Sequence, residues 1–241
     1  MSLYSSVRSE LMKLKHTSFW AIHILVPVLG AALFVFYFLQ YGSVDSDKKL
    51  KLILELITMA FPLLASMIAG RNVLQEERAS YFQNVLAVSD RSKSFLSKLV
   101  ILYGAGIISL LLLSLLLILG VSLGGKAEAV KIGLLFKAVF GIAAGNLIIY
   151  LLNFFLSFRF GMGVSLFWGV FETLQCIIYS NVELRGAARL IPFSWAVNLM
   201  QDMLNGTESI SELVAIILLT AVAMIIILVW FHNWEGRKNY E

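Results

Sequence analysis

Charged side chains are scarce in this chain. Asp, Glu, Lys and Arg together make up 14% of its 241 residues, whereas 59% are hydrophobic, and the mean hydropathy is +0.85. A soluble domain of this composition would have too little polar surface to stay dissolved. Loops that face anionic lipid explain the net charge of +4 at pH 7 more simply than nucleic acid does. The composition therefore predicts a protein that crosses a membrane several times and binds no nucleic acid.

Cysteine and histidine are also nearly absent. Cys176 is the single cysteine, so no intramolecular disulfide can form, and its place in an apolar run favours a buried structural side chain. The histidines His16, His23 and His232 lie far apart and lack the spacing of a metal site. We therefore expect no metal site and no catalytic site in this chain.

A complete nucleotide-binding loop is missing as well. Residues 120–127, GVSLGGKA, come close to the phosphate-binding pattern, but Ala127 stands where a serine or threonine would hold magnesium. The segment also follows an apolar run, whereas a phosphate-binding loop follows a strand. We therefore expect the chain itself to bind no nucleotide and no other cofactor.

Apolar runs, by contrast, are long and numerous. The first, residues 19–41, has 23 residues without a charge, which is too long for the core of a signal peptide and long enough to cross a bilayer. The sequence predicts an all-α, polytopic membrane protein with a single domain over residues 1–241. The six spans that we expect lie at about 19–41, 52–70, 99–123, 136–158, 160–181 and 212–232.

The Lys and Arg residues predict the orientation of these spans. If the N-terminus lies inside, eleven of the 19 Lys and Arg residues fall on the inner side and eight on the outer side. An even number of spans brings both termini to the same side. We therefore expect a multi-pass protein of the bacterial cytoplasmic membrane with both termini in the cytoplasm.

The segments outside the spans are not featureless. Residues 2–18 have apolar side chains on one helical face and basic ones elsewhere, which predicts an amphipathic helix lying in the interface. A very short turn around residues 157–159 should make the fourth and fifth spans adjacent and antiparallel. Residues 184–205 are apolar but interrupted by Gly186 and Pro192, which indicates an outer re-entrant or interfacial segment.

The longest polar interruption is the loop at residues 71–98. Within it, residues 76–88 have apolar side chains near the helical period, which predicts one short amphipathic helix. Ser89, Asp90 and Arg91 read as a turn or as the cap of the following helix. A helix of this kind binds a cytoplasmic partner or, alternatively, lies on the lipid headgroups without a partner.

Polar and small residues inside the spans supply further candidates. Glu172 is the one acid well inside a span, with Gln175 close by, so it should line a pathway, meet a partner helix or form a structural hydrogen bond between helices. Gly141 and Gly145 have the spacing that permits close helix contact, which gives weak support for a dimer.

Together these features resemble the permease subunit of a type-2 ABC exporter. The similarity covers the whole chain: an entry helix that ends in basic residues at 11–15, six spans, a helix-bearing loop between the second and third spans, and a broken outer loop with IPFSW at residues 191–195.

The loop itself is also similar to that family. Residues 76–98 follow its order of acid, small residue, apolar pair, serine, arginine and later lysine. Two departures are Ala79, where a glycine is frequent, and the Ser89-Asp90 pair before Arg91, where a proline often stands. The size of the chain and the LKHT run at residues 14–17 look most like lantibiotic immunity permeases.

The resemblance implies a complex and a substrate class. Two permease subunits, identical or related, would bind two separately encoded ATPase subunits, which would hold the ATP. The substrate would be a lantibiotic or other amphipathic peptide, or another hydrophobic compound or drug, expelled from the membrane. The loop helix would dock on the ATPase, braced by the entry helix, through Glu76, Glu77, Tyr81, Phe82, Val85, Leu86 and Arg91.

Two other classes of protein stay open at this point. A membrane-embedded enzyme would need acids and histidines that converge at one depth, which the sequence does not offer. A sensory or structural membrane subunit without transport needs no such residues. An ATPase that is purified together with the chain would favour the exporter over both.

Overall fold

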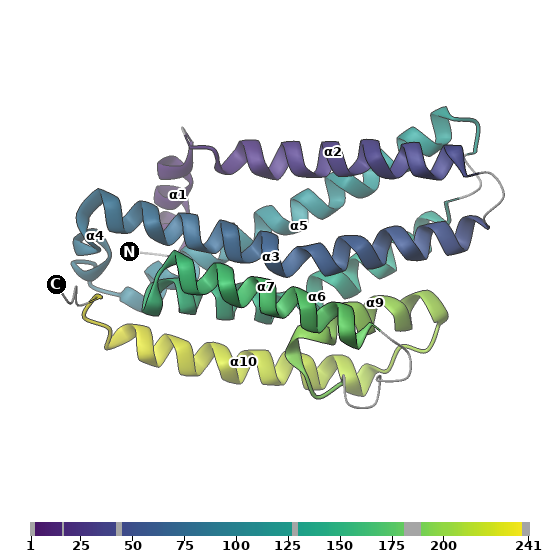
Figure 1. Cartoon of the computed structure of the whole chain (residues 1–241). Helices are drawn as coiled ribbons and strands as arrows, with labels where there is room; N and C mark the ends of the chain where they lie inside the picture. The colour runs from purple at the N-terminus through teal and green to yellow at the C-terminus, as the bar shows by residue number, and fades with distance from the viewer. Residues whose placement is uncertain (1–2, 16, 42–44, 127–129, 181–188, 238–241) are drawn as a thin grey trace.

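The computed structural model describes residues 3–15, 17–41, 45–126, 130–180 and 189–237, and within these ranges every regular element is a helix (Figure 1). This confirms the all-α prediction. In chain order the elements are α1 (Leu3–Leu14), α2 (Phe19–Gln40), α3 (Ser46–Ser80), α4 (Gln83–Leu86), α5 (Arg91–Leu123), α6 (Ile132–Phe160), α7 (Met162–Tyr179), the 3₁₀ turn η3 (Pro192–Ser194), α9 (Trp195–Asn205) and α10 (Ile210–His232).

Six of these helices are long and apolar enough to cross a membrane, as the sequence predicts. They are α2, α3, α5, α6, α7 and α10. Figure 1 shows them side by side along one common direction, with α1 lying across one end of the bundle. The short helix α4 and the last described residues after α10 lie at that same end. The segments at residues 3–14, 81–90 and 233–237 therefore all lie at one end of the bundle.

Two helices extend far beyond their predicted spans. The apolar part of α3 was expected at residues 52–70, but the helix has 35 residues, and α5 has 33. At 1.5 Å per residue both are roughly 50 Å long, against about 30 Å for the hydrocarbon core of a bilayer. The residues that prolong α3, LQEERA at positions 74–79, are mostly strong helix formers. Residues 71–80 and 91–98 of the predicted polar loop are therefore helical continuations of α3 and α5.

The turn between α6 and α7 consists of one residue. The sequence placed this turn around residues 157–159, whereas α6 continues to Phe160 and only Gly161 separates the two helices. Gly161 has φ +96°, a conformation that a residue with a Cβ rarely adopts. The two helices pack against each other, so their predicted adjacency is confirmed.

Helix α9 packs against the first half of α6 through the two glycines of the small-residue pattern. A Cβ on Gly145 would lie 2.4 Å from the Cα of Ala196, and one on Gly141 would lie 3.1 Å from the backbone of Leu199. The predicted close helix contact therefore exists, but its partner is α9 of the same chain. Because α9 occupies the surface of these glycines that a second chain would need, the small-residue pattern gives no support for a dimer contact at this point.

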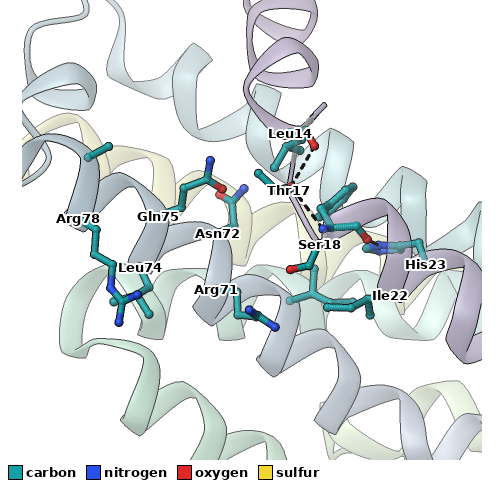
Figure 2. Close-up of a pocket in the computed structure, with 13 residues that line it drawn as sticks. Leu14, Thr17, Ser18, Ile22, His23, Arg71, Asn72, Leu74, Gln75 and Arg78 are labelled. Carbon is teal, nitrogen blue, oxygen red and sulfur yellow. Dashed lines mark hydrogen bonds between the residues drawn. The ribbon is translucent and has the colours of Figure 1, made fainter.

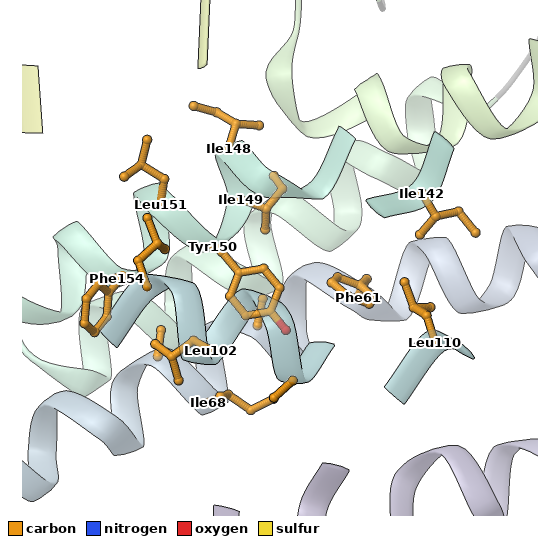
Figure 3. Packing of buried hydrophobic residues seen from close by; sticks show 14 of the residues in the cluster. Phe61, Ile68, Leu102, Leu110, Ile142, Ile148, Ile149, Tyr150, Leu151 and Phe154 are labelled. Carbon is orange, nitrogen blue, oxygen red and sulfur yellow. The ribbon is translucent and has the colours of Figure 1, made fainter. Parts of the chain in front are cut away.

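The centre of the bundle is formed by α3, α5 and α6 around Tyr150. Figure 3 shows its ring surrounded by apolar side chains, among them Phe61, Ile68 and Leu102. The ring centroids of Phe61 and Tyr103 each lie 5.8 Å from that of Tyr150 in edge-on geometry, an arrangement that aromatic rings favour. Helix α2 packs along α5 and touches α3 much less, so it is attached to this core from one side only.

Candidate functional site

The polar end of α3 leads into a sharp change of chain direction. Tyr81 and Phe82 have φ angles of +47° and +68°, both in the left-handed region, and α4 follows immediately. The N–H of Tyr81 donates to the carbonyl of Glu77 and ends α3 in the way left-handed caps do. The prediction of one continuous helix over residues 76–88 is therefore wrong. The segment is the end of α3, a left-handed break and a helix of four residues.

The reason for this break is the side chain of Phe82. Left-handed backbone costs a residue with a Cβ about 1–2 kcal/mol, and burial of a large aromatic ring offsets that cost. Phe82 is only 3% exposed, and its ring lies 5.1 Å from that of Trp234 and 6.0 Å from that of Phe158, between centroids. Val85 is 2% exposed. Both residues anchor the loop to the bundle, so their predicted role as a free docking face is wrong.

A different set of residues on this loop faces outward. Tyr81 is 73% exposed, because the left-handed break turns its side chain away from the core while it turns Phe82 inward. Leu86 is half-buried and contributes little free surface. We call the exposed residues at positions 81–88 the exposed tip; they are Tyr81, Gln83, Asn84, Ala87 and Val88.

Where α1, the end of α3 and the start of α5 meet, four charged side chains form a compact cluster. The Nζ of Lys98 on α5 binds the carboxylates of Glu10 on α1, at 2.5 Å, and of Glu76 on α3. Lys13 on α1 binds the same two carboxylates at 2.9 and 3.1 Å. The side chain of Lys98 is 1% exposed. We call these residues the charge cluster; its two positive and two negative charges balance, as burial requires.

The charge cluster connects three helices that are far apart in the sequence. Burial acts against the charge of Lys13, but its hydrogen bond to Glu10 and the charges of Glu10 and Glu76 raise its pKa above the ordinary value. The sequence placed Glu10 and Lys13 on the polar face of an interfacial helix and did not assign them a partner. In the structure that face turns toward α3 and α5, so α1 braces the end of α3 directly.

The segment after α10 is attached to the other side of the same loop. Arg237 forms an ion pair with Glu77 at 2.5 Å, and its guanidinium lies 5.0 Å from the ring centroid of Phe82. Arg91 donates hydrogen bonds to the carbonyls of Trp234, at 2.8 Å, and of Leu86. The predicted coupling residues Glu77 and Arg91 thus hold the chain together at this point, where they are only partly accessible.

The start of α5 is capped as the sequence predicts. Asp90 precedes the helix, and its side chain accepts a hydrogen bond of 3.0 Å from the backbone N–H of Lys93. The Lys93 side chain and this N–H hold the pKa of Asp90 below its ordinary value. The cap marks the point where the loop ends and α5 begins, and it confirms the second of the two interpretations of this segment.

Glu172 lies inside the bundle, between α7 and α6. It is fully buried, and one carboxylate oxygen accepts a hydrogen bond of 2.5 Å from the Nδ2 of Asn153. The hydroxyl of Ser165 bonds to the backbone carbonyl of Asn153 at 3.1 Å. Gln175 is half-buried, one turn further along α7. Of the alternatives for Glu172, the structure favours a hydrogen bond between two helices of one chain. The signal for its partner was Asn153, a polar side chain near the end of the apolar fourth span.

Comparison with known proteins agrees with this architecture. A model of the family described as "ABC-2 family transporter protein" matches residues 6–172, from within α1 to Glu172 in α7. No curated protein and no solved structure matches the chain. The matched segment includes all four residues of the charge cluster and the whole exposed tip. The chain therefore belongs to the ABC-2 family of transporter proteins and is a membrane-spanning permease subunit.

Proposed function

We propose that this permease works in an ATP-driven exporter that expels a lantibiotic or a similar amphipathic peptide from the cytoplasmic membrane for self-protection. Two permease subunits, identical or related, would assemble with two separate ATPase subunits that bind the ATP. The end of the bundle that carries the exposed tip would face the cytoplasm together with both termini. The membership in the ABC-2 family supports the transport role, and the peptide substrate rests on the resemblance to lantibiotic immunity permeases.

The observation that carries the proposal is the attachment of the exposed tip. The tip is continuous with α3 and α5, the charge cluster joins these helices to α1, and Arg237 joins the loop to the segment after α10. A short segment held on several sides can transmit a displacement to the spans without first bending. An ATPase that moves the tip would therefore move several helices at once.

The exposed tip also has the chemistry of a docking contact. Tyr81 is a large aromatic side chain that packs little against its own chain, and Val88 adds apolar surface beside polar Gln83 and Asn84. Aromatic residues of this kind dominate the affinity of many protein interfaces, and the loss of one anchor costs roughly 2 kcal/mol or more. The tip thus suits a groove on a partner with an apolar centre and a polar rim.

A direct test combines partner identification with a resistance assay. The permease is purified with a tag from its own cells, and the proteins that remain bound are identified by mass spectrometry. The same cells are challenged with a lantibiotic, with and without an ATPase that cannot hydrolyse ATP. We expect an ABC ATPase in the purified complex and a resistance that depends on hydrolysis.

The outcome separates the alternatives. Resistance to a hydrophobic drug but not to the peptide would keep the exporter and change its substrate. An ATPase in the complex without ATP-dependent efflux of any compound would favour a sensory or structural subunit. Recovery of the permease without an ATPase under conditions that preserve other ABC complexes would contradict the proposal.

A further inference from the structure

A cavity of about 450 Å³ lies beside the polar end of α3, apart from the charge cluster and the exposed tip. It is lined by Leu14 at the end of α1, Thr17 and Ser18, the first residues of α2 and the last turns of α3. Figure 2 shows Arg71, Asn72, Gln75 and Arg78 along one stretch of α3, near the turn with Thr17 and Ser18. Its size is in the range of cavities that bind small molecules.

The cavity is positively charged and its charges are not neutralised. Arg71, Gln75 and Arg78 stand at positions i, i+4 and i+7, so they share one face of α3. Both arginines are exposed, and neither forms an ion pair within the described ranges of the chain. The described lining contains no acidic residue. A ligand for this cavity should therefore carry negative charge.

Two buried hydrogen-bond acceptors in the cavity indicate which polar groups the ligand should carry besides its negative charge. Asn72 is 8% exposed and His23 is 6% exposed, and neither Asn72 Oδ1 nor His23 Nε2 has a hydrogen-bond partner in the part of the chain that the structure describes. The Nδ1 of His23 lies 2.8 Å from the carbonyl oxygen of Phe19. A carbonyl only accepts, so Nδ1 carries the proton and Nε2 of the neutral ring is an acceptor. A ligand that satisfies both atoms must donate hydrogen bonds.

The position of the cavity points to a lipid. The apolar part of α2 begins beside the cavity, at Phe19, and the apolar part of α3 ends beside it, at Gly70. The lengths and compositions of the two spans therefore place the cavity at the level of the lipid headgroups. A second, apolar crevice of about 40 Å³ adjoins it, lined by Val26, Pro27 and Leu64 of α2 and α3 and closed by residues of α5 and α6. The two share Ile22, His23 and Ile68. A soluble anion would use the cavity alone, whereas a lipid would use both.

We propose that this cavity binds the headgroup of an anionic phospholipid that carries free hydroxyl groups, such as phosphatidylglycerol. Its phosphate lies between Arg71 and Arg78, which are about 10 Å apart along the helix axis and both long enough to reach one phosphate. Its hydroxyls donate to Asn72 and His23, and the first carbons of one acyl chain lie against the apolar crevice. The lipid connects α2 to α3, two helices that otherwise touch little.

The test uses the full chain purified in neutral detergent, with thermal unfolding and native mass spectrometry as readouts. Phosphatidylglycerol should raise the unfolding temperature and remain bound, whereas phosphatidylcholine should do neither. Arg71→Gln and Arg78→Gln should each weaken phosphatidylglycerol binding about fivefold, the effect of one cation near an anionic headgroup. The control is Arg8→Gln, which removes an exposed arginine from α1 outside the cavity and should leave binding unchanged.

A second pair of measurements tests the hydroxyl contacts and the source of the phosphate. Asn72→Leu should abolish the preference for phosphatidylglycerol over phosphatidylmethanol, which has the same charge and no free hydroxyl. Glycerol 3-phosphate at millimolar concentration should not displace the lipid. If it does, the cavity binds a soluble phosphate ester and the lipid assignment is overturned. The lipid assignment is also overturned if phosphatidylcholine binds as tightly as phosphatidylglycerol, or if Arg8→Gln weakens phosphatidylglycerol binding as much as the cavity variants do. If Asn72→Leu does not fold, the binding measurements on Arg71→Gln and Arg78→Gln decide whether the cavity binds the lipid.

Discussion

Lys98 on α5 and Glu10 on α1 form an ion pair, with Nζ and Oε2 2.5 Å apart although 88 positions separate the two residues in the sequence. The pair is covered by protein, so its charges are stabilised by each other and by Glu76 and Lys13 more than by water. It fixes α1 across the end of the bundle. The entry helix is therefore part of the folded permease and not only a segment that rests on lipid.

The first prediction concerns Lys98. Lys98→Met leaves two buried carboxylates with only Lys13 to neutralise them, so we expect a loss of about 3 kcal/mol or more in stability. Lys98→Met combined with Glu76→Leu should recover part of the lost stability, because Glu10 and Lys13 then remain as a pair of opposite charges. Thermal unfolding in detergent measures both. The control Lys93→Met breaks an exposed pair with Asp90 and should leave the unfolding temperature close to that of the wild type, because water screens exposed pairs. Equal losses for Lys93→Met and Lys98→Met would show that the charge cluster does not brace α1.

The second prediction separates docking from folding in the loop. Tyr81→Asn combined with Val88→Ser removes apolar surface from the exposed tip, and asparagine tolerates the left-handed backbone at position 81. This variant should unfold like the wild type but bind its ATPase more than tenfold more weakly, which a detergent pull-down measures.

Phe82→Ala is the matched comparison for the second prediction. It should destabilise the permease by about 3–5 kcal/mol, because it empties a buried site between Trp234 and Phe158. Full ATPase recovery by the double variant at the tip would mean that the ATPase docks elsewhere.

The third prediction concerns Glu172. Glu172→Leu removes the acceptor from the Nδ2 of Asn153 and should cost about 1–3 kcal/mol in stability, whereas Glu172→Gln keeps an acceptor and should cost less. Transport should fall only as far as the amount of folded permease falls. Gln175→Leu, on the same helix and half-buried, is the control and should change little. Transport that is lost at unchanged stability would instead place Glu172 in the substrate pathway.

The fourth prediction concerns the contact between α6 and α9. Gly145→Val forces side-chain atoms into the backbone of Ala196 and should destabilise the fold by at least 1–3 kcal/mol. Gly104→Ala is the control, because no atom lies within 4 Å of a Cβ at that position and alanine favours a helix. Thermal unfolding measures both. A Gly145 variant that folds normally but fails to dimerise would restore the interpretation of this pattern as a dimer contact.

The fifth prediction concerns orientation. Ser89 and Ser209 are both exposed. Ser89 follows α4, which lies at the end of the bundle where α10 ends, whereas Ser209 directly precedes the start of α10. In a Cys176→Ala background, a membrane-impermeant thiol reagent should label Ser209→Cys in intact cells and should label Ser89→Cys only after the cells are opened. The reason is the excess of Lys and Arg on the side of Ser89. The opposite pattern would place the exposed tip outside, where no ATPase can reach it.

The sequence by itself determined the features that depend on one stretch of chain. The length and polarity of a run decide whether it can cross a bilayer, so the six spans were predictable from apolar runs such as residues 19–41. The cap at Asp90 was predictable for the same reason, because its partner is the N–H three residues further on. The pair Gly141 and Gly145 indicated a close helix contact without the identity of the second helix.

The tertiary structure decided which surface each side chain meets. The helical period put Phe82 and Val85 on an apolar face, but an apolar face can meet a partner or a core equally well. The left-handed break at Tyr81 and Phe82 decides between the two, and it turns Phe82 and Val85 toward the core. Glu10 is on the polar face of an amphipathic helix, and a polar face is normally exposed. It is buried because Lys98 arrives from a helix 88 positions away. No local pattern encodes a contact of that separation, since its energy exists only after the helices have packed.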